Sequence, residues 1–171
     1  VETIIKKGGK TIDKYLTPFG IRSVKFDKDK GFFLNNKHLK LKGMCLHQDA
    51  GCLGTAVPDR AYERRLLILK EFGTNAIRCS HNPPEFLNYC DSIGFLVIDE
   101  AFDKWKSGYY EEFFDSSWQQ DISDMVIRDR NHPSVILWSI GNELAEAKLK
   151  DDTGIERAGM LQDFVHQLDP S

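Results

Sequence analysis

The chain has 171 residues, of which 41% are hydrophobic and 11% aromatic, so it can bury the core of one ordinary domain. Its formal net charge is −3 and its basic residues are scattered, which argues against nucleic acid as a partner. No apolar stretch approaches the roughly 20 residues that cross a bilayer, so we expect no membrane segment. The four cysteines lack Cys-x-x-Cys spacing and are expected to be free thiols.

The first part of the chain predicts antiparallel strands. Gly8-Gly9 separates two short stretches that contain apolar residues, which is typical of a β-hairpin. A second hairpin is expected over residues 31–39, turning at Asn35-Asn36, because asparagine tolerates a positive φ angle. We interpret residues 1–24 as the last strands of an all-β domain with a linker, and residues 25–171 as a second domain.

From residue 39 onward, short continuous apolar runs alternate with helical spacing, which predicts a parallel α/β sheet. The four expected strands span residues 39–46, 76–79, 95–98 and 135–140. The expected helices begin at a cap on Asp59, at Pro84, at a cap on Ser116 or Ser117, and near Gly154. Four such units are half of a (β/α)8 barrel, and right-handed crossovers would leave the first and fourth strands as open edges.

The expected helices also have predicted buried faces and ends. The first helix should end at Gly73 and bury one face made of Tyr62, Leu66, Leu69 and Phe72. The second should be stopped by Gly94, since glycine readily adopts the left-handed conformation that ends helices.

The fourth expected strand ends in polar residues. Val135 to Trp138 form an apolar run that fits a strand buried on both faces, and Asn142 and Glu143 follow it. Because ligands of parallel α/β folds bind at the carboxyl ends of strands, these two side chains should face a cleft. Taken alone, an Asn-Glu pair would favour a solvated helix start; the apolar run before it favours the cleft.

Two longer stretches resemble the signatures of a known family. Residues 129–143, Asp-Arg-Asn-His-Pro-Ser-Val-Ile-Leu-Trp-Ser-Ile-Gly-Asn-Glu, resemble the acid/base signature of glycoside hydrolase family 2, which includes β-galactosidases, β-glucuronidases and β-mannosidases. Residues 75–83 resemble a second signature and depart from it only at Asn82, where tyrosine is usual. The resemblance extends from about Phe19 to Ser171. It implies the first half of a TIM barrel, preceded by the last strands of an immunoglobulin-like β-sandwich.

The resemblance also implies a retaining mechanism, in which two carboxyl groups lie about 5 to 5.5 Å apart. Glu143 would be the general acid/base and would hold a proton near neutrality beside the negatively charged nucleophile. The family places that nucleophile on the seventh strand, beyond Ser171, so we expect the chain alone to be inactive. Glu100 is the weaker candidate for the second carboxylate, because its position implies hydrogen bonds to Arg78 and to neighbouring loops.

Further residues are implied to bind the sugar. Asn142 resembles the residue that hydrogen-bonds the 2-hydroxyl, and Arg78 the one that pairs with the nucleophile. His47, Asp49 and His81 follow strands at the same rim, where sugar hydroxyls would be contacted. The alternatives are structural: Asn142 could cap the strand end, and the histidines could be satisfied loop residues.

The sequence gives little support for a metal. His47 and Asp49 are permissible ligands, but nothing else in the pattern adds to them. Some β-galactosidases have a magnesium-binding Glu and His just after the third strand, where this chain has Phe102-Asp103-Lys104-Trp105. We expect neither a metal nor a cofactor. Trp105, Tyr109 and Tyr110 could stack on a sugar, although aromatic residues of a long loop more often pack the loop down.

The expected function is that of an enzyme with a carbohydrate substrate. Residues 45–51, 82–84 and 102–105 resemble the bacterial β-galactosidase branch, which favours β-galactoside hydrolysis. A homo-oligomer is expected for the full-length enzyme. The alternatives are a β-glucuronidase or β-mannosidase of the same family. A non-catalytic half-barrel that binds sugar or serves assembly is the alternative outside the enzymes.

Overall fold

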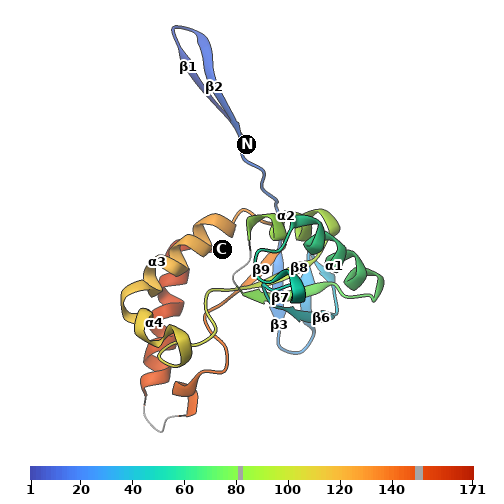
Figure 1. The fold of residues 1–171 in the computed structure, drawn as a ribbon. Coiled ribbons are helices and arrows are strands. Elements are labelled where there is room, and N and C mark those ends of the chain that lie inside the picture. The colour runs from blue at the N-terminus through green and yellow to red at the C-terminus, as the bar shows by residue number, and fades with distance from the viewer. Residues whose placement is uncertain (81–82, 149–151) are drawn as a thin grey trace.

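A computed structural model describes residues 1–80, 83–148 and 152–171. Within these residues the strands form a hairpin, a small antiparallel sheet and a parallel sheet along the chain (Figure 1). The hairpin contains β1 (Glu2–Lys7) and β2 (Lys10–Leu16); the antiparallel sheet contains β3 (Val24–Asp27), β4 (Gly31–Leu34) and β5 (Lys37–His38). The parallel sheet has the order β6 (Gly43–Leu46), β7 (Ala76–Ser80), β8 (Leu96–Glu100) and β9 (Val135–Ser139).

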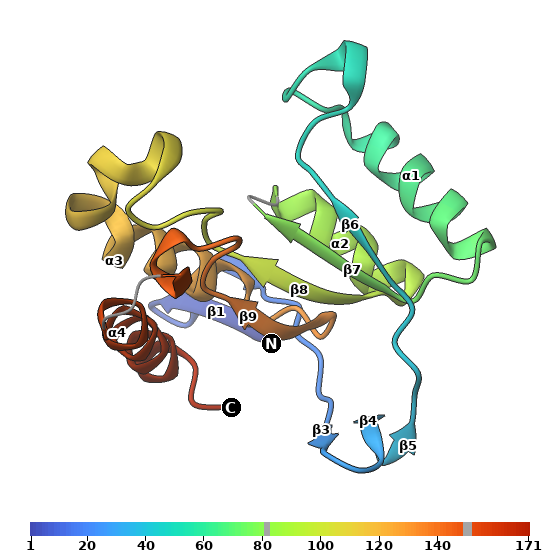
Figure 2. The same cartoon turned by 90° about the horizontal axis from the view of Figure 1, so that it is seen from below.

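The helices follow the strands of the parallel sheet in chain order. They are α1 (Asp59–Glu71), α2 (Pro84–Ile93), α3 (Glu111–Asp129) and α4 (Thr153–Leu168). Figure 2 shows α1 and α2 beside β6 and β7, and α3 and α4 beyond β9. This sequential parallel order with intervening helices confirms the predicted half of an α/β barrel. No helix in the described part of the chain is both long and apolar enough to span a membrane.

Two apolar cores hold these helices in place. The first lies between α1, α2 and the middle strands, with Leu66, Phe86 and Val97 fully buried. The second joins the loop after β8 to α3 and α4 through Trp105 and Phe114, among others. The loop that follows β8 is therefore packed down and is part of the core.

Both predicted hairpins are confirmed. Gly8 and Gly9 have φ angles of 57° and 78°, and Asn35 and Asn36 have φ angles of 50° and 63°. The strand β3 was not predicted. It pairs with β4 through a turn in which the Asp27 carboxylate accepts the N–H groups of the two residues that complete the turn.

The first barrel strand is shorter than predicted. The expected strand began at residue 39, whereas β6 begins at Gly43. The reason lies in Asn75, whose side-chain oxygen accepts the Lys42 N–H at 2.7 Å and whose amide donates to the Lys40 carbonyl at 3.0 Å. A side chain thus satisfies backbone groups that a longer strand would have paired. The last strand also ends one residue early, at Ser139.

The start and the buried face of α1 differ from the prediction. Pro58 precedes the helix in extended conformation and Asp59 is the first helical residue, with no side-chain cap, so the predicted Asp59 cap is wrong. Tyr62 and Leu66 are buried as predicted and Leu69 is partly buried, but Phe72 is 84% exposed. Phe72 lies just beyond the last helical residue and therefore leaves the periodicity of the buried face.

The prediction is right for α2 and wrong for the start of α3. Gly94 ends α2 with φ 82°, as expected for a left-handed cap. In contrast, α3 begins at Glu111, five residues before the predicted cap at Ser116. The Ser116 hydroxyl donates to the Phe113 carbonyl at 3.1 Å, a bond to the preceding turn that serines make inside helices.

A β-bulge lies between β8 and β9. Val97 pairs with Val135, but the next residue, Ile98, pairs with Leu137, so Ile136 is an extra residue in β9. Beyond the bulge, Ser139 pairs with Glu100. None of the four cysteines forms a disulfide: Cys79 and Cys90 are buried, and Cys45 and Cys52 are exposed.

Candidate active site

A cavity of about 560 Å³ lies at the carboxyl ends of all four parallel strands. It brings together four of the side chains predicted for the site: His47, Arg78, Asn142 and Glu143. Asp49 is exposed in the loop after β6 and is not among the lining residues. His81 lies outside the described residues.

An ion pair between Arg78 and Glu100 lies at the centre of the cavity wall. Arg78 is in β7 and Glu100 ends β8, and their parallel register places both side chains on the same face of the sheet. The Arg78 guanidinium donates to both carboxylate oxygens of Glu100, from Nη2 at 2.9 and 2.6 Å and from Nε at 3.0 Å. The Ser139 hydroxyl donates to the same carboxylate at 2.6 Å.

This pair has a clear electrostatic consequence. The side chain of Glu100 is only 4% exposed, and hydrogen bonding to it raises the pKa of Arg78 above its usual value. The buried side chain of Glu100 therefore has little exposed surface with which to reach a sugar. The contact matches the structural role that the sequence favoured for Glu100.

Glu143 has a different environment at the end of β9. Its backbone φ is 47°, a left-handed conformation that is uncommon for residues other than glycine, and its side chain is 79% exposed. Lys104 Nζ lies 3.2 Å from Glu143 Oε2, 3.0 Å from an Asp103 carboxylate oxygen and 3.4 Å from the Asn142 carbonyl. Bonding to Asp103 and then to Glu143 raises the pKa of Lys104.

Asp103 connects Lys104 to Asn142. Its carboxylate accepts the Asn142 side-chain amide at 2.5 Å, and its backbone carbonyl accepts the Asn142 N–H at 2.5 Å. Burial alone raises the pKa of Asp103, but the bonds from Asn142 and Lys104 outweigh it and lower the pKa overall. The sequence did not identify Asp103 and Lys104 as site residues, although their place directly after β8 could have indicated them.

The aromatic residues of the same loop divide between packing and exposure. Trp105 is 1% exposed and its indole N–H donates to the Ile140 carbonyl at 2.5 Å. Tyr110 stacks on Phe102 with ring centroids 5.2 Å apart, whereas Tyr109 is fully exposed. Trp105 and Tyr110 therefore pack the loop down, and Tyr109 is the one of the three left free to contact a ligand.

Gly141 is required by this packing. A Cβ atom at Gly141 would lie 2.8 Å from Trp105 Nε1 and 2.8 Å from a methyl group of Leu144. The φ angle of 156° is also one that other residues rarely adopt. The close approach of Gly141 to Trp105 thus sets the path of the chain just before Asn142.

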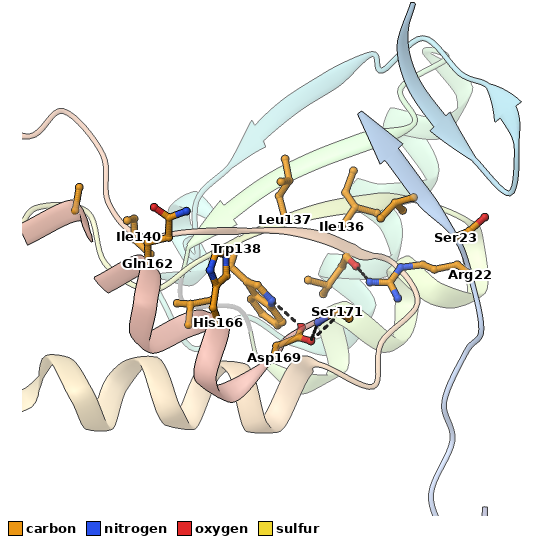
Figure 3. Close-up of a pocket in the computed structure, with 14 residues that line it drawn as sticks. Arg22, Ser23, Ile136, Leu137, Trp138, Ile140, Gln162, His166, Asp169 and Ser171 are labelled. Atoms are coloured by element: carbon orange, nitrogen blue, oxygen red, sulfur yellow. Dashed lines mark hydrogen bonds between the residues drawn. The ribbon is translucent and has the colours of Figure 1, made fainter. Parts of the chain in front are cut away.

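A second cavity, of about 590 Å³, lies along the outer edge of β9 (Figure 3). β9 contributes its apolar side chains, and Trp138 donates to an Asp169 carboxylate oxygen at 3.0 Å. Arg22 donates a hydrogen bond to the Val135 carbonyl of β9 (Figure 3). In the described part of the sheet β9 pairs only with β8. We interpret this cavity as an unpaired strand edge, because it lacks the clustered acids of the first cavity.

Comparisons with known proteins agree with this geometry. Residues 24–171 match the family described as "Glycosyl hydrolases family 2, TIM barrel domain". The chain is 48% identical to a beta-galactosidase of Bacteroides ovatus, over 96% of this chain and 20% of that protein. It is 34% identical to a beta-glucuronidase of Bacteroides fragilis, over 100% of this chain and 25% of that protein.

Solved structures give the same result. The crystal structure of a glycosyl hydrolase family 2 member from Bacteroides cellulosilyticus superposes with a TM-score of 0.87 at 47% identity, over 97% of this chain and 22% of that one. A beta-glucuronidase from Parabacteroides merdae superposes with a TM-score of 0.80 at 27% identity, over 99% of this chain and 22% of that one. The chain thus spans about a fifth to a quarter of the length of these relatives. With its strand order, its cavity and these matches, the chain belongs to glycoside hydrolase family 2.

Proposed function

We propose that this chain is the acid/base-bearing half of a retaining glycosidase that removes terminal β-linked sugars, with β-galactosides as the substrate class. The observation that carries the proposal is the placement of Glu143. Its exposed carboxylate lies at the carboxyl end of β9, in a cavity built by all four strand ends. The 48% identity to a beta-galactosidase supports the choice of sugar.

In the proposed reaction, Glu143 gives a proton to the glycosidic oxygen while a second carboxylate attacks the anomeric carbon. Glu143 then takes a proton from the water that releases the sugar. Glu100 is unsuited to the attack, because its side chain is only 4% exposed. We therefore assign the nucleophile to the remaining half of the barrel, whose strands we place against the open edge of β9.

The charges of the cavity favour a neutral sugar. Arg78 and Lys104 are its two basic side chains among the described lining residues, and both bind carboxylates. Neither is therefore free to bind a carboxylate of the substrate. A uronic acid carboxylate would lack a cation here, unless the other half of the barrel supplies one.

β-Glucuronidase activity is the second candidate, because relatives at 45% and 34% identity are named a putative beta-glucuronidase and a beta-glucuronidase. The two are separated by measuring kcat/KM of the full-length protein on matched nitrophenyl β-galactoside, β-glucuronide and β-mannoside. We expect the galactoside to be preferred. A preferred glucuronide would contradict the charge argument, and no turnover of any of the three would favour a non-catalytic sugar-binding module.

The role of Glu143 is tested by Glu143→Gln in the full-length protein. Hydrolysis of a natural disaccharide should fall about 100- to 10,000-fold, because its leaving group needs a proton. A dinitrophenyl galactoside needs no such proton, so it should still form the glycosyl-enzyme quickly and release the sugar slowly. Azide should restore the second step and give a glycosyl azide of retained configuration.

The matched control is Glu112→Gln, a change of an exposed residue at the start of α3. It should leave both substrates unaffected. If Glu143→Gln slows the glycosylation step equally for both substrates and azide has no effect, Glu143 is not the acid/base.

A further inference from the structure

We propose that Lys104 is the positioning residue of the acid/base: its ammonium group holds Glu143 Oε2 and leaves Oε1 as the oxygen that exchanges the proton. The inference rests on the proposed role of Glu143. It adds a residue that does not itself react, and it assigns different roles to the two carboxylate oxygens of Glu143.

First, Glu143 needs a contact that fixes the position of its side chain. Its side chain is 79% exposed and its backbone is in the left-handed region, so packing does little to restrict it. An exposed glutamate has substantial rotamer freedom, which costs up to about 2 kcal/mol to remove. A general acid must nevertheless be held in place, because a displacement of about 1 Å can cost about 100-fold in rate. Among the described residues, Lys104 provides the ion pair that can do this.

The second step is that Lys104 is itself held from several sides. Its side chain is only 25% exposed and it binds Asp103 at 3.0 Å and the Asn142 carbonyl at 3.4 Å. Asp103 in turn binds Asn142 through both its side chain and its backbone. The next residue, Trp105, is buried. The ammonium is thus fixed to the same loop that carries Glu143.

The third step concerns the direction of the hydrogen bond. An ammonium group can only donate, so Glu143 Oε2 must accept from Lys104. The acidic proton then resides on Oε1. As the bond between the anomeric carbon and the leaving oxygen breaks, Oε1 gives its proton to that oxygen. When water later releases the sugar from the enzyme, Oε1 takes a proton from that water. Lys104 keeps its three protons throughout.

The test uses Lys104→Met, Lys104→Arg and the control Lys106→Met in the full-length protein. Lys106 is two residues away on the same loop, but its ammonium binds Asp115 on α3. Each variant is assayed with phenyl and dinitrophenyl β-galactoside. For Lys104→Met we expect kcat on the phenyl substrate to fall about 100-fold, with little change in glycosylation by the dinitrophenyl substrate. Lys104→Arg should recover part of the phenyl rate, and Lys106→Met should change neither.

Equal losses on both substrates for Lys104→Met, or no loss on either, would overturn the inference. Thermal melting of each variant shows whether an equal loss comes from unfolding. Glu143→Gln is measured in the same assay. If it fails to discriminate between the two leaving groups, the proposed acid/base is wrong; if it discriminates and Lys104→Met does not, only the positioning role is wrong.

Discussion

The two ends of the parallel sheet use similar side chains for different purposes. At the carboxyl end, Glu143 is exposed, lies in a left-handed backbone conformation and is held by an ammonium group. At the amino end, the Asp91 carboxylate of α2 accepts hydrogen bonds from the His132 ring at 2.7 Å and from the Ser134 N–H at 3.0 Å. Both oxygens of Asp91 are occupied, and the pair ties α2 to the loop before β9.

The comparison shows which features separate chemistry from support. A histidine-carboxylate pair resembles catalytic machinery on paper, yet this one is mostly buried and lies at the end of the sheet that barrels use for stability. The acid at the other end is exposed and conformationally strained. Position at the carboxyl end of the sheet, together with solvent access, therefore distinguishes the proposed acid/base from a supporting carboxylate better than residue type does.

The largest effect is expected when residues 1–171 are assayed alone. We expect no turnover of a nitrophenyl galactoside, because Glu100 is buried in its ion pair with Arg78 and the nucleophile is assigned to the other half of the barrel. We also expect self-association in light scattering, since β6 and β9 each pair on one side only in the described sheet. Turnover that disappears on Glu100→Gln would make Glu100 the second carboxylate, and a monodisperse monomer would refute the exposed-edge argument.

The next largest effect should come from Arg78→Met. The change leaves the Glu100 carboxylate buried without its guanidinium, which should cost about 3 kcal/mol in the free energy of unfolding. Arg60→Met is the matched control, because Arg60 forms an exposed pair with Glu63 on α1 and should cost less than about 1 kcal/mol. Urea unfolding of the full-length protein followed by tryptophan fluorescence measures both. Similar costs for the two variants would show that the carboxyl-end pair contributes no more than a surface pair.

A smaller effect is expected from Gly141→Ala. The added methyl group would collide with Trp105 and Leu144, so we expect a loss of about 2 kcal/mol and a lower kcat. Gly159→Ala provides the control, because Gly159 lies within α4 and a Cβ there would meet no atom within 4 Å. That change should stabilise the protein by about 0.5–1 kcal/mol. The two glycine-to-alanine substitutions should thus change the free energy of unfolding in opposite directions. Changes in the same direction would contradict the close packing at Gly141.

The smallest effect concerns the amino end and depends on pH. The hydrogen bond that His132 donates to Asp91 raises the pKa of His132; burial raises the pKa of Asp91, but the bonds that Asp91 accepts from His132 and Ser134 outweigh burial and lower that pKa. His132 therefore stabilises the fold below its ordinary pKa of 6.5, and this contribution is lost as pH rises through the higher folded value. Asp91 contributes above 3.8, and its contribution is lost as pH falls through the lower folded value.

Asp91→Asn should accordingly destabilise the protein most between about pH 4 and 6.5, by about 1–2 kcal/mol, and less at alkaline pH. Melting temperatures across this range, beside those of the parent protein, measure the effect. The leaving-group dependence of hydrolysis should stay unchanged, because Asp91 is remote from Glu143. A cost that is the same at every pH would refute the charged pair.

The sequence predicted the parts of the fold that depend on local patterns. The apolar run of β9, the limits of α2 and the Asn35-Asn36 turn all follow from residues close together in the chain. It misplaced the start of α3, because the Ser116 hydroxyl bonds within the helix and mimics a cap only in the sequence.

The site was predicted from its strand-end positions, but the contacts within it were not. Asp103 and Lys104 meet Asn142 and Glu143 across 39 residues of sequence, through bonds that depend on how two loops pack. No sequence pattern in either segment alone indicates that these residues are in contact. The roles of the assembled residues remain predictions, and the enzyme assays above are their test.

Because of the bulge between β8 and β9, the side chains that face the carboxyl end of the sheet depend on the number of residues in β9. Side chains alternate between the two faces of a strand, so one extra residue reverses the facing of everything that follows it. Without Ile136 as the extra residue, Trp138 in place of Ser139 would stand opposite Glu100. Point substitutions leave this count intact, whereas a single-residue deletion in β9 would turn the strand end around. Insertions and deletions here are therefore far more damaging than their size suggests.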